Sequence, residues 1–449
     1  MDIKKHRTFL TYLTNKYTLK CLDVELLLTV VSKMLQYVDD NILQIMYVDL
    51  YDDVYNYSLE IMKNDYLDSD ILENIYNLSK EESNKLLKIY LKMGQSYIYK
   101  YVMPKRSYYK NHIRNNSINY TKIDKQLNTL INIVQPEQRT DEWYIFRNST
   151  LTASNIYKIF VSEYSQTQLI LEKCEPLNIN KFKVTNTNSP MHWGQKYEPV
   201  SILYYEHIYK TTVTEFGCIP HRDHSFIAAS PDGIVCDQSS NLYGRMLEIK
   251  NVVSREITGI PKMEYWIQMQ LQMEVCDLNE CDFLETKFLQ YDTEEEYIND
   301  NTIEYKGIIL QYLKDESPHY IYAPFMLNDL HSTEYKEWES KVMEKNKDLQ
   351  LITRIYWKLV KISCVLVLRN KLWFKNVLPM IDVFWKNLVD ERESGKYKER
   401  IKKKRKLSLD DAKSRSDFPT GGCLINTNLF NKEDNVENVI ISVNTEVIL

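Results

Sequence analysis

The spacing of apolar residues predicts a helical N-terminal region. Residues 1–96 contain no proline, and their apolar side chains recur three or four positions apart, as in Leu26, Leu27, Val30, Val31, Met34 and Leu35. This spacing is typical of amphipathic helices whose apolar faces pack into a core. We therefore predict a separate helical domain over residues 1–96, without a chemical motif of its own.

After residue 136 the pattern alternates between helices and short strands. Apolar runs predict strands over 212–218, 225–229, 246–250 and 283–289. Helices are expected over 194–209 and after Pro261, and a late strand at 320–322. The helices predicted beyond it carry four tryptophans on their apolar faces, namely Trp338, Trp357, Trp373 and Trp385.

Two segments have a different character. Residues 97–135 interleave tyrosines with lysines and arginines, and we interpret them as a linker that either contacts a nucleic-acid backbone or is merely solvated. Residues 396–449 are expected to form a basic, polar and flexible tail. Its basic run, 402–406, is a nuclear address, a DNA contact or a solvated segment.

Composition narrows the class of protein. The 449-residue chain is 44% hydrophobic and 27% charged, as expected of a globular protein, and its net charge of −5 excludes a generally basic nucleic-acid binder. The eight cysteines form no Cys-x-x-Cys pair, which indicates reduced thiols inside a cell. No signal peptide is evident, and the most apolar run, 362–368, is too short to span a membrane.

Two carboxylates and a lysine occur close together in the strand-rich region. Asp232 lies at a bend, where Gly233 is expected to adopt a positive φ. On a strand over 246–250, Glu248 and Lys250 point to the same face. Because carboxylates repel each other, their grouping favours a Mg²⁺ or Mn²⁺ site beside a lysine that orients or deprotonates water. Alternatively, they form a turn cap and a solvated strand face.

Residues upstream offer an anion site and another acid. A helix expected to begin at Thr152 or Ser154 would present N–H groups and a hydroxyl, with Arg147 nearby. The alternative is an ordinary helix cap and a surface arginine. Glu198, on the helix over 194–209, is either a further acidic ligand or a surface glutamate.

Five short motifs follow one another along the chain. They are Trp143-x₃-Arg147-x₄-Thr152-Ala153-Ser154, Trp193-Gly194-x₂-Tyr197-Glu198, Ser230-Pro231-Asp232-Gly233, Leu247-Glu248-Ile249-Lys250 and Tyr265-x₂-Gln268-x-Gln270. In this order they resemble the lambda-type exonucleases, which include the YqaJ-like viral recombinases of the PD-(D/E)xK nuclease superfamily. The sequence looks like a version carried by a large DNA virus. The resemblance covers about residues 138–289, with a weaker helical similarity up to residue 385.

The resemblance implies an α/β (α+β) fold with a restriction-endonuclease-like core. A central mixed sheet flanked by helices is expected within a nuclease domain over residues 136–395, which includes a C-terminal helical extension. The N-terminal helical domain, the linker and the tail are additions to this core.

The resemblance also implies catalytic roles. Asp232 and Glu248, helped by the Ile249 carbonyl, are similar to the ligands of the main Mg²⁺ or Mn²⁺ ion. Glu198 is similar to a glutamate that reaches a second ion. Lys250 is similar to a lysine that positions the attacking water.

The remaining motif residues resemble groups that contact the substrate. Tyr265 and Gln268 are similar to residues that orient the lysine and the DNA. Arg147 and Ser154 resemble a pair that binds the 5′-phosphate of a DNA end. Ser230 resembles a residue that holds a backbone phosphate.

The function implied is a metal-dependent 5′-to-3′ exonuclease that acts on linear duplex ends in viral recombination, repair or replication. The expected partners are double-stranded DNA ends, a single-strand annealing protein and further copies of the chain in a ring of three, but no membrane. The expected location is intracellular, in the host cytoplasm or nucleus. The alternatives are a structure-specific endonuclease of the same superfamily and a non-catalytic DNA-binding module.

Overall fold

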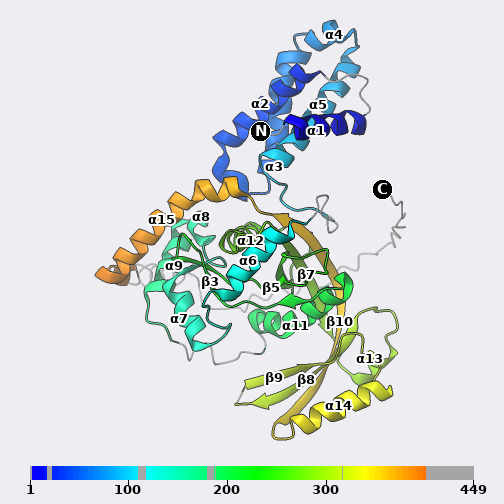
Figure 1. The fold of residues 1–449 in the computed structure, drawn as a ribbon, viewed down its shortest axis with the longest axis vertical. Helices are drawn as coiled ribbons and strands as arrows, with labels where there is room; N and C mark the ends of the chain where they lie inside the picture. Colours follow the sequence, from blue (N-terminus) through cyan, green and yellow to red (C-terminus); the bar gives the residue numbers. More distant parts are fainter. Residues whose placement is uncertain are drawn as a thin grey trace, which may run out of the picture. The chain divides into compact units, whose positions relative to one another are not determined.

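The computed structural model describes residues 3–17, 23–109, 118–178, 187, 189–315 and 317–400 (Figure 1). The basic run 402–406 lies outside these residues. All the elements discussed below belong to the unit of residues 1–397. Among the described helices, none combines the length and the hydropathy that a membrane crossing requires.

The N-terminal region is helical, as predicted. Side-chain caps fix the starts of two of these helices. The Asp23 carboxylate accepts a hydrogen bond from the Leu26 N–H, and Ser79 and Glu82 form a reciprocal capping box. The elements are α1 (Ile3–Lys16), α2 (Val24–Asp40), η1 (Ile42–Met46), α3 (Leu50–Met62), η2 (Lys63–Leu67), α4 (Ile71–Tyr76) and α5 (Lys80–Tyr101).

A seven-stranded mixed sheet forms the centre of the following region. Its strand order is β2-β5-β6-β7-β10-β8-β9, and only the β6–β7 pair is parallel. The strands are β2 (Val213–Thr214), β5 (Gly233–Val235), β6 (Met246–Asn251), β7 (Glu280–Gln290), β8 (Lys306–Lys314), β9 (Ser317–Tyr322) and β10 (Gln350–Leu368). The predicted fold class, a mixed sheet flanked by helices, is confirmed.

A second, small sheet and the remaining helices complete the region. The sheet has the order β1-β4-β3, from β1 (Leu151–Thr152), β4 (Ile227–Ala229) and β3 (Ile219–Pro220). The helices are α6 (Tyr120–Asn132), α7 (Asp141–Ser149), α8 (Lys158–Val161), α9 (Glu163–Cys174), α11 (Pro190–Tyr209), α12 (Met263–Val275), α13 (Glu294–Asn299), α14 (Thr333–Lys345) and α15 (Lys371–Ser394).

Half of the large sheet was not predicted from the sequence. The long strand β10 pairs with β8 through its first half and with β7 through its second half, as Figure 1 shows. Trp357, expected on a helix, lies in this strand, where its ring meets Phe288 edge to face at 5.5 Å. Lysines interrupt the apolar pattern of β10, and this explains why periodicity alone did not reveal it.

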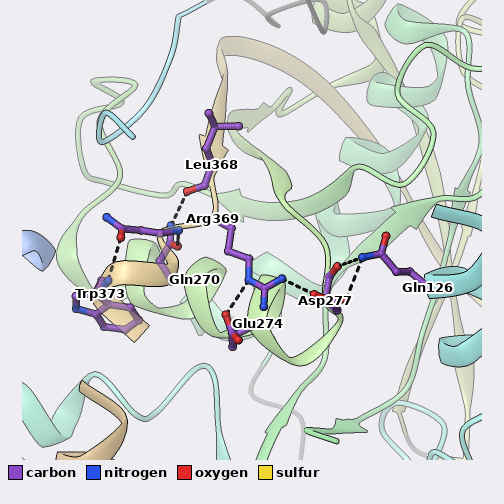
Figure 2. A network of polar contacts seen from close by, with 8 residues as sticks. Gln126, Gln270, Glu274, Asp277, Leu368, Arg369 and Trp373 are labelled. Atoms are coloured by element: carbon purple, nitrogen blue, oxygen red, sulfur yellow. Dashed lines mark hydrogen bonds and ion pairs between the residues drawn. The ribbon is translucent and has the colours of Figure 1, made fainter. Parts of the chain in front are cut away.

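Helix α12 is joined by polar contacts to the segment where β10 ends and α15 begins. The Arg369 guanidinium contacts Glu274 and Asp277 at 2.7 Å each (Figure 2). Nearby, the Gln270 amide donates to the Leu368 carbonyl at 3.0 Å and accepts from the Asn370 N–H at 2.6 Å. These contacts join α12 to the end of β10 and the start of α15, and so hold the helix against the sheet.

A buried arginine, Arg106, connects the N-terminal helices to α12. The guanidinium of Arg106 donates to the Met46 carbonyl at 2.7 Å and to the Pro261 carbonyl at 2.9 and 3.0 Å. It also lies 4.9 Å from the ring of Trp266. Arg106 therefore connects η1 to the start of α12. It belongs to residues 97–135, the segment that we interpreted from the sequence as a linker.

Candidate active site

Strand β6 presents different residues to the two layers of helices. Leu247 and Ile249 pack in a cluster with Tyr205 of α11, whereas Met246 packs with Trp266 of α12. Because side chains alternate along a strand, Glu248 and Lys250 share the α12 side with Met246. This confirms the expected common face of the glutamate and the lysine.

Asp232 is held beside β6 by the backbone. Its Oδ2 accepts a hydrogen bond from the Ile249 N–H at 2.7 Å, which brings the carboxylate to the middle of the strand. Gly233 lacks the expected positive φ. A Cβ at this position would instead lie 2.1 Å from Cγ1 of Val213, so glycine is required because β2 approaches closely.

The Glu248 carboxylate is fully buried and has two side-chain partners. Its Oε1 accepts from the Lys250 ammonium, and its Oε2 accepts from the Gln272 amide at 2.7 Å. The Lys250 ammonium also lies 5.2 Å from the Tyr265 ring, and its side chain is 25% exposed. Two residues of α12, seven positions apart, thus contact Glu248 and Lys250 of β6.

The charges of this group perturb one another. Burial raises the pKa of Asp232 well above its ordinary value, and the neighbouring carboxylates of Glu248 and Glu198 raise it further. Burial alone would lower the pKa of Lys250, but the negative charges of Glu248 and Asp232 outweigh it and raise that pKa. Lys250 is therefore protonated here, and it supplies positive charge.

A cavity of about 570 Å³ opens over these residues. Asp232, Lys250, Tyr265 and the Ile249 backbone line it on one side, and Glu198 of α11 on the other. The Glu198 carboxylate pairs with Arg139 at 3.1 Å, and burial raises its pKa. We call this hollow the acidic cavity.

The residues of the acidic cavity fit a hard divalent cation. No group of three or more His, Cys, Asp or Glu side chains close enough to hold a metal exists among the described residues. However, Mg²⁺ in proteins is commonly held by one or two carboxylates together with waters and substrate oxygens. Asp232 and Glu248 provide that number, and a cation would offset the burial and the mutual repulsion that disfavour the charge of Asp232.

A second cavity, of about 510 Å³, is lined by cations. Arg147 lies with its guanidinium carbon 4.3 Å from the Trp143 ring, and its Nη2 donates to the Ser154 hydroxyl at 3.1 Å. The Trp143 indole donates in turn to the Ser230 hydroxyl at 3.3 Å. Arg139, Lys158 and Lys173 also line this hollow, with Glu172, which pairs with Lys158 at 2.6 Å; we call it the basic cavity.

The predicted helix start at Ser154 is wrong. Residues 153–157 form turns, and α8 begins only at Lys158 with four residues. The Thr152 N–H is taken by the Asn155 side chain at 3.0 Å, a local hydrogen bond that competes with helix formation. The described part of the basic cavity therefore offers side chains at Ser154, and no helix begins there.

The two cavities adjoin one another. Met191 and Gln195 of α11 line both of them. The ion pair between Arg139, which lines the basic cavity, and Glu198, which lines the acidic one, lies across the boundary. Because α7, α11 and β6 supply these walls, residues far apart in the sequence form one continuous site.

A family model of the YqaJ-like viral recombinase domain matches residues 142–279, which include both cavities' principal side chains. Over these residues the chain is similar to the YqaJ-like viral recombinase domain. The family resemblance predicted from the motifs is thereby confirmed.

Other comparisons extend beyond this domain. A protein of Acanthamoeba polyphaga mimivirus, "Uncharacterized protein R354", is 32% identical over 364 residues, or 70% of this chain and 62% of that protein. The chain thus spans less than two thirds of that relative's length. A solved structure, the alkaline exonuclease LHK-Exo from Laribacter hongkongensis, is 22% identical with a TM-score of 0.33 and covers 58% of this chain and 98% of its own. A phage related exonuclease from Haemophilus somnus 129PT is 13% identical with a TM-score of 0.28, over 54% and 96%.

One residue of the YqaJ-like domain that contacts the site was missed from sequence. Gln268 was expected to act with Tyr265, but its side chain forms no hydrogen bond within the described residues. Gln272 contacts Glu248 instead. Gln272 lies seven positions after Tyr265, or about two helical turns, so both residues are on the same face of α12. This spacing was the signal in the sequence that could have identified Gln272.

A buried lysine of the basic cavity was also missed. Lys173 of α9 is 4% exposed, and its ammonium donates to the Arg147 carbonyl at 2.6 Å. Burial lowers its pKa to about 8, against the opposing effect of Glu172. In the YqaJ-like domain this lysine therefore supports the backbone that carries Arg147.

Proposed function

We propose that the chain is a metal-dependent DNA exonuclease that degrades linear duplexes from their 5′ ends. The observation that carries the proposal is the junction of the two cavities through Met191, Gln195 and the Arg139–Glu198 pair. One cavity suits a divalent cation and the other a phosphate, as hydrolysis next to a DNA terminus requires. The match to the YqaJ-like family supports the same reaction class.

Asp232, which lines the acidic cavity, and Glu248, whose carboxylate contacts Lys250 of that cavity, are the residues that would hold Mg²⁺ or Mn²⁺, together with the Ile249 carbonyl. Glu198 would serve a second ion once Arg139 releases it. When bound, such ions neutralise a phosphodiester, lower the pKa of water and stabilise a leaving oxygen. The carboxylates keep their positions through the Ile249 N–H and the Gln272 amide.

Lys250 acts on the charge of the reacting phosphate. Its ammonium is protonated and lies against Glu248 and the Tyr265 ring. A fixed positive charge in a partly buried site favours the negative charge that develops as water attacks. Lys250 thus orients the water and stabilises charge, and Tyr265 keeps the ammonium in place.

In the basic cavity, Arg147 and Ser154 would bind a terminal 5′-phosphate. Their side chains already lie 3.1 Å apart, so a phosphate beside the pair could accept from the guanidinium and from the hydroxyl. Ser230, joined to Trp143, would contact a phosphate nearer the acidic cavity. A pocket that requires a terminal phosphate confines cleavage to 5′ ends and sets the 5′-to-3′ polarity.

The experiment is incubation with Mg²⁺ of a 5′-phosphorylated linear duplex and of a covalently closed circle of the same sequence. We expect the linear duplex to be degraded and the circle to survive. Cleavage of the circle at a comparable rate would favour the structure-specific endonuclease. If neither substrate is cleaved, the non-catalytic module is favoured.

Two partner proposals follow from the family alone. A single-strand annealing protein would use the 3′-ended strand that such digestion leaves, and co-purification tests it. A ring of three subunits would enclose the duplex, and light scattering of the purified chain tests it.

A further inference from the structure

We propose that Gln272 is the positioning residue that fixes the metal-binding orientation of Glu248. The inference rests on the proposed function, since it concerns the ion that serves that reaction. It starts from two buried glutamines on α12, Gln270 and Gln272, which have different hydrogen-bond patterns.

The Gln272 amide contacts both the Glu248 carboxylate and the backbone at Ser230. Its Nε2 donates to Oε2 of Glu248 at 2.7 Å and to the Ser230 carbonyl at 3.3 Å. Both partners are acceptors, so the amide must present its nitrogen to them; the flipped amide would place Oε1 against two oxygens. One side chain therefore connects the acidic carboxylate with the turn that carries Ser230.

The other polar atom of the Gln272 amide, Oε1, forms no hydrogen bond within the described residues. This atom is buried, and the residue is 0% exposed. Burying an unpaired acceptor destabilises the fold. A glutamine kept for stability would use both atoms, as Gln270 does with Leu368 and Asn370.

The contact also fixes the orientation of the two oxygens of the Glu248 carboxylate. Because Gln272 holds Oε2, Glu248 cannot rotate about its last torsion without losing a charged hydrogen bond in a site closed to water. Its Oε1 is then kept on the side of Lys250, which lines the acidic cavity. Groups that orient a metal-binding carboxylate in this way typically change metal affinity or activity by roughly 10–100-fold when removed.

The test compares Gln272→Met with Gln270→Met in the full chain. Both changes remove a buried amide of the same size from the same helix, so both lower the melting temperature. Mn²⁺ affinity is measured by calorimetry without DNA, and the Mg²⁺ concentration for half-maximal cleavage is measured with linear duplex. We expect Gln272→Met to weaken Mn²⁺ binding and raise the Mg²⁺ requirement by at least tenfold, and Gln270→Met to change either by less than twofold.

Equal Mn²⁺ affinities in the two variants would overturn the inference, as would an absence of Mn²⁺ binding by the wild type. If Gln272→Met does not fold, Gln272→Asn replaces it, because that change keeps the amide but withdraws it from Glu248 by one methylene; the same loss of affinity is expected. An inactive wild type whose Mn²⁺ affinity depends on Gln272 would contradict the proposed nuclease while leaving this inference intact.

Discussion

The acidic and the basic cavity share a wall but are built in opposite ways. At the acidic cavity, two carboxylates are held by neighbours in regular structure, Asp232 by the backbone of β6 and Glu248 by α12, whereas Glu198 pairs with Arg139 in a turn. In the basic cavity, Arg147 rests on Trp143 and a serine in a turn. The difference is that Asp232 and Glu248 are fixed by strand and helix partners, whereas Arg147 contacts other side chains.

The largest effect should come from the acidic cavity. Asp232→Asn keeps the acceptor for the Ile249 N–H but removes the charge that would hold the cation. We expect a loss of roughly a thousandfold or more in cleavage rate, since metal ions contribute several kcal/mol to such reactions. The melting temperature without divalent ions should stay the same or rise, because burial and neighbouring carboxylates disfavour this charge.

The control for this variant is Asp223→Asn, a partly exposed aspartate outside both cavities. It should keep the wild-type rate. Full activity in Asp232→Asn would contradict the assignment of the acidic cavity to the metal ion.

Lys250→Met should separate turnover from binding. The ammonium acts on the developing charge, so its loss should slow cleavage by roughly a hundredfold or more. Binding of duplex in Ca²⁺, measured by fluorescence anisotropy, should change by less than a few fold. A parallel loss of binding would instead make Lys250 a phosphate anchor and remove the functional contrast between the cavities.

A smaller, substrate-dependent effect is expected in the basic cavity. Wild type should degrade 5′-phosphorylated duplex faster than 5′-hydroxyl duplex, and Arg147→Ala should erase that preference. The lost charged hydrogen bonds are worth about 1.5–3 kcal/mol, or at least tenfold in rate. Initial rates on the two substrates test this, with Arg222→Ala, an exposed arginine, as the control. If wild type shows no preference, the basic cavity is structural.

The smallest effect concerns stability. The folded pKa of Lys173 is about 8 and its ordinary value is 10.5. Between these values the unfolded chain holds a proton that the folded chain has released, so this residue makes the free energy of unfolding rise with pH. Lys173→Met should remove about 2 kcal/mol of that rise between pH 8 and pH 10.

Denaturant unfolding at both pH values measures the difference between wild type and variant. Lys386→Met, at an exposed lysine, is the control and should leave the pH dependence unchanged. An unchanged rise in Lys173→Met would mean that water reaches the ammonium in the basic cavity.

The sequence predicted the acidic cavity better than the basic one for a physical reason. A strand has a fixed alternation of side chains, so the amino-acid sequence alone places Glu248 and Lys250 on one face. The turn at residues 153–157 depends on a local hydrogen bond of Asn155, which no periodicity reports. The pairing of β10 with β7 and β8 likewise depends on long-range contacts, and Gln272 was missed because the motif ended at Gln270.

The measurement that tests the joint use of the two cavities most directly is the size of the first product from a 5′-³²P-labelled linear duplex. Because the cavities share Met191 and Gln195, a phosphate bound beside Arg147 places the cut a fixed, short distance away. With Mg²⁺ and excess enzyme, wild type should release one short labelled product of constant length from the earliest time point. A spread of longer labelled fragments that shorten with time would show that cleavage is internal, and would contradict the account.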